Sequence, residues 1–408
     1  MDHLDLPHFL GLLVAILGAA KLLGAFAQWI GQPAVLGELC AGVVLGGSVL
    51  GIVDPKTEVL HLLSELGIII LLFAIGLETD LKKLLKVGGA SSVVAIAGVA
   101  LPFAFGYAVC LLLGLSNLVA VVAGATLTAT SVGITARVLS DLNRLQEPES
   151  QIVLGAAVID DVIGLVILTV VAGATQGEGI SAWGVARTTL AAFGFLVGTL
   201  LVGKAIVPAI VQRLSKIDLP GTPTMLALLL AFGLAWLANY AGSATIIGAF
   251  AAGLLIRETP DAHEVERGIA HLGHFFVPLF FVVVGAAVDL NVFNPLQSEN
   301  HRTLVVGGAL IIAAVLGKFL AGYAPFWIRG NKRVIGVGMI PRGEVGLIFA
   351  QMGLTSGVFD AALFSAVALM VMVTTFMAPP LLKLLFPPVP GPRADKEPEA
   401  IEDLVTEP

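Results

Sequence analysis

The stretch that decides the fold runs from Ala156 to Leu168 and reads AAVIDDVIGLVIL. It is apolar except for two adjacent acids, Asp160 and Asp161, and no basic residue stands near them in the sequence. An ionisable side chain at the middle of a bilayer costs at least about 2.5 to 3.5 kcal/mol, so it needs a partner or a function. The stretch therefore predicts a membrane helix that carries functional carboxylates.

The whole chain has the composition of a membrane protein. Of its 408 residues, 57% are hydrophobic and only 12% are charged, about half the charged fraction of a soluble domain. The net charge is -7, but five acids lie in the last twelve residues, so no nucleic-acid partner is indicated. The two cysteines, Cys40 and Cys110, are embedded in apolar sequence, which excludes a disulfide framework and a thiolate metal cluster.

Apolar runs long enough to span a bilayer recur from Phe9 to Phe386. We count thirteen, of which the ninth, Thr245 to Ile256, is the shortest. Continuous runs favour helices, because the strands of a membrane barrel alternate in polarity. Thirteen spans place the loops alternately on two sides, and Lys and Arg divide between these sides twelve to three. Since positive loops stay in the cytoplasm, we expect the N-terminus outside and the C-terminus inside.

The sequence contains an internal repeat. LLFAIGLETDL from Leu71 and FFVVVGAAVDL from Phe280 both place Gly four residues before Asp-Leu, at an offset of 209 residues. VLGELCAGVVLG from Val35 and IIGAFAAGLLI from Ile246 match at an offset of 211. Either offset equals seven predicted helices, an odd number that inverts the second copy, and inverted repeats are typical of secondary transporters. The alternative is that Gly-rich membrane helices resemble one another by composition.

Inverted repeats predict a broken helix at corresponding places in the two copies. The fifth span contains TLTATS, Thr126 to Ser131, whose hydroxyls can satisfy backbone groups freed by unwinding. The twelfth span contains GMIPRGE, Gly338 to Glu344, where a proline removes a backbone donor and a glycine loosens the turn. Two pairs of residues have alternative roles. Thr130 and Ser131 either lend oxygens to a cation or cap backbone. Arg342 and Glu344 either gate the site or form an internal salt bridge that braces the broken helix.

A third charge completes the intramembrane set. Lys318, alone in the apolar run AAVLGKFLAG, is the expected partner of one aspartate. Adjacent helical residues point about 100° apart, so Asp160 and Asp161 have separate roles and one is left for a transported ion. A carboxylate in a dehydrated cavity binds either a small hard cation or a proton, so the two compete, and alternating access then gives antiport. The alternative is a purely structural bridge. For Glu38, in the second span, we expect a structural role, either at the membrane interface or in a contact between helices.

Together these motifs, with PAVLGELCAGVVLG at Pro33 and PRGEVGLIF at Pro341, resemble the monovalent cation:proton antiporter family in its bacterial sodium/proton exchanger branch. The resemblance implies an all-α polytopic membrane protein with 13 transmembrane helices, two of them discontinuous and crossing, and a homodimer. It also implies a domain organisation. The dimerisation domain would comprise 9–81 and 223–290, the mobile core 85–175 and 302–386, and the linker helix 181–214, while the acidic tail 387–408 is expected to be disordered.

The resemblance also assigns roles by position. It makes Asp161 the main ligand of sodium (or lithium) and of the proton, and Asp160 the partner of Lys318. Thr128, Thr130 and Ser131 fall in the first broken helix, and Pro341, Arg342 and Glu344 in the second. An Asp-Asp pair implies electrogenic exchange across a bacterial inner membrane. The expected ligands are the transported ions, with no cofactor, and the expected partners are a second copy and membrane lipids.

Three other functions are conceivable for a membrane protein with these residues. Potassium/proton antiporters of the same superfamily often carry a nucleotide-binding domain and a Gln-Asp pair, and neither is seen in this sequence. A passive channel would lack the proton coupling that the pairing of Asp160 with Lys318 indicates. An intramembrane aspartyl protease, and with it an enzyme, is disfavoured because its two carboxylates must share one water, which adjacent residues of one helix cannot do.

Overall fold

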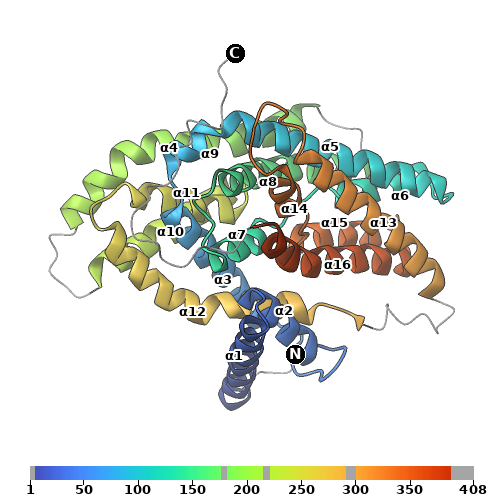
Figure 1. Ribbon diagram of the computed structural model, residues 1–408, viewed down its shortest axis with the longest axis horizontal. Coiled ribbons are helices and arrows are strands. Elements are labelled where there is room, and N and C mark those ends of the chain that lie inside the picture. The colour runs from blue at the N-terminus through green and yellow to red at the C-terminus, as the bar shows by residue number, and fades with distance from the viewer. Residues whose placement is uncertain (1–4, 176–181, 215–220, 291–299, 387–408) are drawn as a thin grey trace.

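The computed structural model describes residues 5–175, 182–214, 221–290 and 300–386, and every regular element in these ranges is a helix (Figure 1). In chain order they are α1 (Leu6–Trp29), α2 (Ala34–Leu45), α3 (Glu58–Glu78), α4 (Leu81–Lys86), α5 (Gly88–Leu112), α6 (Asn117–Thr126), α7 (Val132–Asp141), α8 (Pro148–Thr175), α9 (Ala182–Leu214), α10 (Thr222–Tyr240), α11 (Thr245–Arg257), α12 (Ala262–Ala286), α13 (Asn300–Ala321), α14 (Lys332–Gly338), α15 (Glu344–Thr355) and α16 (Ala361–Leu385). The predicted all-α membrane fold is confirmed. The expected disordered tail, 387–408, lies outside the described residues.

Nine of the described helices are long and apolar enough to cross a membrane. The other predicted spans correspond to shorter elements. The second and ninth are α2 and α11, of 12 and 13 residues. The fifth and twelfth are interrupted, as expected: α6 and α7 are separated by residues 127–131, and α14 and α15 by 339–343. Because these elements are too short to span the hydrocarbon by themselves, the count of thirteen stays a prediction.

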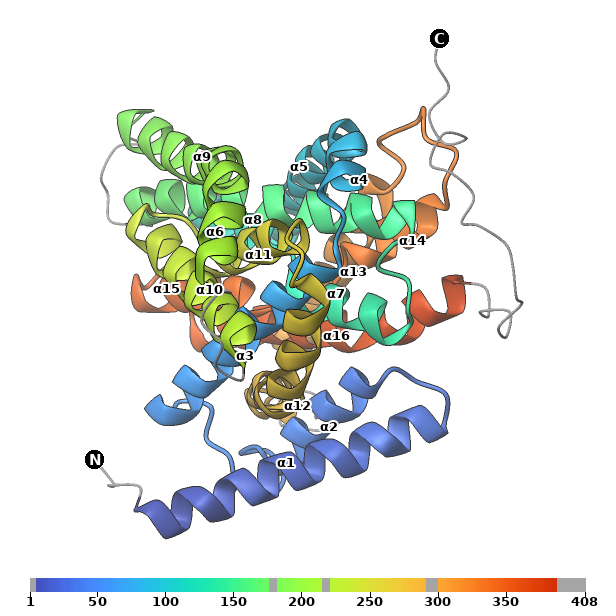
Figure 2. The ribbon, with the colours of Figure 1, turned by 90° about the vertical axis from the view of Figure 1, so that its left-hand side faces the viewer.

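The packing follows the inverted repeat. When each helix is matched to the one seven spans later, contacts occur in equivalent pairs. Thus α1 packs on α2 as α10 does on α11, α2 packs on α12 as α11 does on α3, and α5 packs on α8 as α13 does on α16. Figure 2 shows α1 along the lower edge of the molecule, with α2 beside it. The second copy is therefore a structural repeat of the first, beyond a likeness of composition.

Glycines of the two repeat motifs form the closest helix crossings. A Cβ on Gly285 would lie 2.1 Å from the carbonyl oxygen of Leu39, where α12 crosses α2 beside Gly42. A Cβ on Gly253 would lie 2.3 Å from the carbonyl oxygen of Phe73, where α11 crosses α3 beside Gly76. Small residues let helix backbones approach in this way within membranes. The motifs that revealed the repeat are thus the contacts that hold α2, α3, α11 and α12 together.

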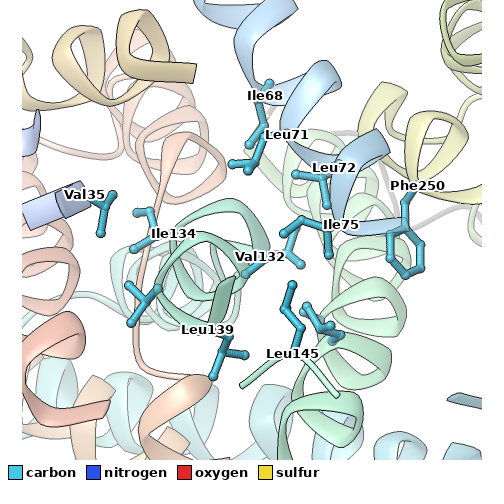
Figure 3. Close-up of a cluster of buried hydrophobic side chains, with 14 of the residues drawn as sticks. Val35, Ile68, Leu71, Leu72, Ile75, Val132, Ile134, Leu139, Leu145 and Phe250 are labelled. Carbon is cyan, nitrogen blue, oxygen red and sulfur yellow. The ribbon is translucent and has the colours of Figure 1, made fainter. Parts of the chain in front are cut away.

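An apolar cluster separates these four helices from the first broken helix. Figure 3 shows Ile68, Leu71, Leu72 and Ile75 of α3 directed towards Val132 on α7. Buried residues of α2 and α11 complete this boundary, which contains few directional bonds. It coincides with the boundary between the expected dimerisation domain and the expected core, and the domain limits stay a prediction.

Candidate ion-binding site

The two broken helices meet at their unwound segments. The Ser131 amide donates to the Pro341 carbonyl at 2.8 Å, and the Thr130 hydroxyl contacts the Met339 carbonyl at 3.4 Å. One turn into α7, Thr135 Oγ1 donates to Gly338 O at 2.7 Å. Residues of the first broken helix therefore satisfy carbonyl groups that the second leaves without helical partners. For Thr130, this geometry matches the backbone-capping alternative. Thr128 caps its own helix end, donating to Ala125 O at 2.7 Å.

Arg342 lies at the centre of this crossing and is fully buried. Its Nη1 donates to Ala129 O at 2.9 Å, and its own carbonyl accepts a bond from the Thr375 hydroxyl of α16. Nε and Nη2 have no hydrogen-bond partner among the described residues. The guanidinium thus contacts a carbonyl of the unwound segment 127–131, which follows the C-terminal end of α6. This contact joins Arg342 to the backbone of the first broken helix, and the choice between gating and an internal salt bridge with Glu344 stays a prediction. The side chain of Glu344 lies outside the described part of the chain.

The two residues that the sequence suggested as partners are in contact. Lys318 Nζ of α13 lies 3.0 Å from Asp160 Oδ2 of α8, with side chains 0% and 1% exposed. Asp160 Oδ1 has no hydrogen-bond partner among the described residues. Gly98 of α5 leaves room for the ammonium, because a Cβ there would lie 3.3 Å from Nζ. What this ion pair does in transport stays a prediction.

Asp161 follows on the same helix and is half-buried, more accessible than Asp160. The charges of Asp160, Asp161 and Arg342 all act on the Lys318 ammonium. One site therefore brings together two acids and two bases. No group of three or more His, Cys, Asp or Glu side chains in the described ranges is placed to hold a metal ion. The site does contain carboxylate, hydroxyl and carbonyl oxygens, which are hard ligands of the kind that small cations prefer.

Two hydroxyls of the site were missed by the sequence analysis. Thr135 follows the TLTATS run by one turn, and Thr375 lies in an apolar helix as half of a Thr-Thr pair. Both donate to the second broken helix. The Thr-Thr pair in α16 was a usable signal of a buried polar contact, because its neighbours in the sequence are Met, Val and Phe. The direction in which each hydroxyl points could not be inferred from composition.

A cavity of about 290 Å³ lies between α3, α7 and α12. Its charged lining comprises Glu78, Arg137, Asp141, Glu266 and His274. It borders an ion pair across the apolar boundary, since Arg137 Nη2 of α7 lies 3.7 Å from Glu38 Oε1 of α2. Arg137 Nε also contacts Asp141 Oδ1 at 3.0 Å within α7. For Glu38, the predicted contact between helices is present.

Comparisons with known proteins agree with this architecture. Residues 12–386 match the family described as "Sodium/hydrogen exchanger, transmembrane". The chain is 39% identical to the high-affinity Na⁺/H⁺ antiporter NhaS3 of Synechocystis, covering 95% of this chain and 91% of that protein. It is 36% identical to the Na⁺/H⁺-K⁺ antiporter GerN of Bacillus cereus, covering 91% and 94%.

The fold also matches a solved structure, that of the sodium proton antiporter MjNhaP1 from Methanocaldococcus jannaschii. The TM-score is 0.64 at 18% identity, covering 92% of this chain and 95% of that one. At this identity the likeness concerns the fold alone. Because the family match spans nearly all the described helices and two relatives exceed 35% identity, the chain belongs to the sodium/hydrogen exchanger family.

Proposed function

We propose that this protein exchanges sodium (or lithium) for protons across a membrane, with Asp161 as the site that the two ions share. The observation that carries the proposal is the buried pair of Lys318 and Asp160 beside a more accessible carboxylate. Intramembrane carboxylates mark ion pathways by default. NhaS3 and GerN, which are similar over more than nine-tenths of the chain, are named as Na⁺/H⁺ antiporters.

The charges explain why a cation and a proton exclude each other. With both aspartates ionised and Lys318 and Arg342 protonated, the four side chains of the site sum to zero. A proton on Asp161 adds one positive charge, and so does a bound sodium ion. Adding both would place two uncompensated charges in a dehydrated site, which is strongly unfavourable. Asp161 therefore binds one or the other, and a site that faces the two sides in turn performs antiport.

The movement would be an elevator-like shift of the core against the dimerisation domain. Two observations favour this. The boundary around α7 is largely apolar, so it can slide without breaking many directional bonds, and a cavity with charged lining opens beside it. The functional unit in this proposal is a homodimer in the bacterial inner membrane, in contact with its lipids. Its N-terminus is outside and its C-terminus in the cytoplasm, where the Lys- and Arg-rich loops face.

The exchange would be electrogenic, with more protons than sodium ions moved per cycle. The second proton would be carried by the coupled pair of Asp160 with Lys318 and released when sodium binds, so the site never holds more than one uncompensated charge. Potassium is the alternative cation. It is favoured by the name of GerN, a Na⁺/H⁺-K⁺ antiporter.

Proton flux into proteoliposomes, followed with a pH-sensitive dye, tests this function. Sodium or lithium added on one side should drive protons from the opposite compartment towards that side, with a smaller response to potassium. The response should vanish in Asp161→Asn, which keeps the shape of the side chain but cannot take up a proton. Circular dichroism and gel filtration of the variant verify that it is folded. Exchange that persists in Asp161→Asn would show that Asp161 is not the site shared by the two ions. A response to potassium equal to that to sodium would favour potassium as the transported cation.

A further inference from the structure

The two adjacent threonines of α16 make different hydrogen bonds, although both are buried. Thr374 Oγ1 bonds to its own helix, at 2.8 Å from Met370 O and 3.0 Å from Val371 O. Thr375 Oγ1 instead donates to the carbonyl oxygen of Arg342. That carbonyl belongs to the unwound segment of the second broken helix. Of the two threonines, therefore, only Thr375 forms a hydrogen bond from α16 to the crossing.

The other carbonyls of that segment with observed donors are bonded from the first broken helix. Gly338 O, Met339 O and Pro341 O accept from residues 130–135. Those bonds fix the two unwound segments to each other and leave their position in the bundle to other contacts. The bond from Thr375 supplies such a contact, because it comes from a third helix.

The repeat gives α16 a special place. It is the equivalent of α8, which carries both aspartates, and each of these two helices packs on α7 and on α15. At the offset of 211 residues, Asp161 corresponds to Met372, and Thr375 lies three residues further on, about one helical turn. The crossing is therefore held between α8, which brings carboxylates, and α16, which brings a hydroxyl.

We propose that Thr375 is a positioning residue for the cation site, and this inference rests on the proposed function. By holding the peptide of Arg342, it keeps the guanidinium against Ala129 O and fixes the unwound segment beside the aspartates. Without the hydroxyl, a buried carbonyl loses its donor and the segment is free to shift. The incoming cation must then order its own ligands, which weakens its binding. Small ions of different radius are then also distinguished less well.

Three variants test the proposal. Thr375→Val removes the hydroxyl and keeps the shape, Thr375→Ser keeps the donor, and Thr374→Val removes the neighbouring hydroxyl that bonds only within α16. We expect Thr375→Val to raise the KM for sodium about fivefold or more, to change the maximal rate much less, and to reduce the preference between lithium and sodium. Thr375→Ser should restore most of the affinity, and Thr374→Val should leave KM and preference near wild type.

Sodium-dependent thermal stabilisation of the purified dimer gives a second readout that does not require transport. Thr375→Val should need several times more sodium than wild type for half of the stabilisation. If that variant does not fold, Thr375→Ala takes its place. Wild-type KM in the valine or alanine variant would overturn the inference, and so would an equal shift in Thr374→Val. Absence of exchange in wild-type liposomes would instead refute the proposed function, and the thermal titration would still decide the role of Thr375.

Discussion

Lys318 and Asp160 depend on each other more than any other charged pair of the described structure. Both side chains are almost fully buried, and Lys318 Nζ lies 3.0 Å from Asp160 Oδ2. Removing one partner of such a pair leaves the other charge buried without compensation. The consequence should be large, because broken buried pairs typically lose about 3 to 5 kcal/mol of stability.

The variant Lys318→Met is therefore expected to lower stability by about 3 to 5 kcal/mol, and the double variant with Asp160→Asn should recover much of it. Thermal unfolding in detergent measures both. The control is Arg302→Gln, which breaks the exposed pair of Arg302 with Asp360, whose side chains are 64% and 55% exposed; it should change stability by about 1 kcal/mol at most. If Lys318→Met and the control lowered the stability equally, the ion pair of Lys318 with Asp160 would not stabilise the fold.

In the proposed mechanism, Asp160 also sets how many charges cross per cycle. Asp160→Asn removes the acid of the coupled pair with Lys318, so the exchange should become less dependent on voltage. One elementary charge crossing the membrane couples to about 2.3 kcal/mol per 100 mV, which makes the difference measurable. Exchange rates in liposomes at two clamped potentials should diverge in wild type and converge in the variant. An unchanged voltage dependence would remove the electrogenic mechanism.

At the scale of elements, the glycine crossings hold the helices of the expected dimerisation domain together. Gly253→Ala places a Cβ 2.3 Å from the Phe73 carbonyl, where backbone must move. We expect it to lose about 1 to 3 kcal/mol of stability. Gly233→Ala, in α10, is the matched control, because its new Cβ meets nothing within 4 Å and should stabilise the helix by about 0.5 to 1 kcal/mol. Equal melting temperatures in the two variants would show that α11 and α3 can move apart at this crossing without loss of stability.

The elements were largely predictable because their signals are local. A long apolar run indicates a span wherever it packs, and the hydroxyls of 126–131 and Pro341 mark the two breaks from sequence alone. Lys318 was also predictable as the partner of one aspartate, since very few cations lie deep within the spans, and the family resemblance assigned it to Asp160. The bonds of Thr375 with Arg342 and of Arg137 with Glu38 were not, because they depend on which faces of distant helices meet. Periodicity in a helix that is apolar all round does not indicate those faces.

At the scale of the whole molecule, the ion pair of Glu38 with Arg137 crosses the boundary that the core would have to slide along. Asp141 adds a second link there, since its Oδ2 accepts from the Val35 amide at 3.4 Å. That amide lies in the first turn of α2, whose own N-cap residue, Pro33, makes no side-chain hydrogen bond. The contacts therefore favour the conformation described here over one in which the core has moved.

Glu38→Gln should shift the balance towards the moved conformation, about tenfold for each 1.4 kcal/mol lost. Spin labels at the exposed positions Lys86 and Glu264, in a chain freed of Cys40 and Cys110, report the distance between the expected core and the expected dimerisation domain. The variant should show a second distance that is rare in wild type. The control Glu147→Gln breaks a 2.8 Å pair with Arg144 inside the core and should leave the distribution unchanged. Identical distance distributions for the two variants would argue against a role of the Glu38–Arg137 ion pair in holding the conformation described here.

The most direct test of the central claim is the number of protons released when sodium binds. Titration calorimetry of the purified protein, repeated in buffers of different ionisation enthalpy, measures this number without any transport. If the two ions share Asp161, sodium binding should release protons at a pH where that carboxyl is protonated, and Asp161→Asn should neither bind sodium nor release them. Sodium that binds the wild-type protein with no proton release at any pH would contradict the account.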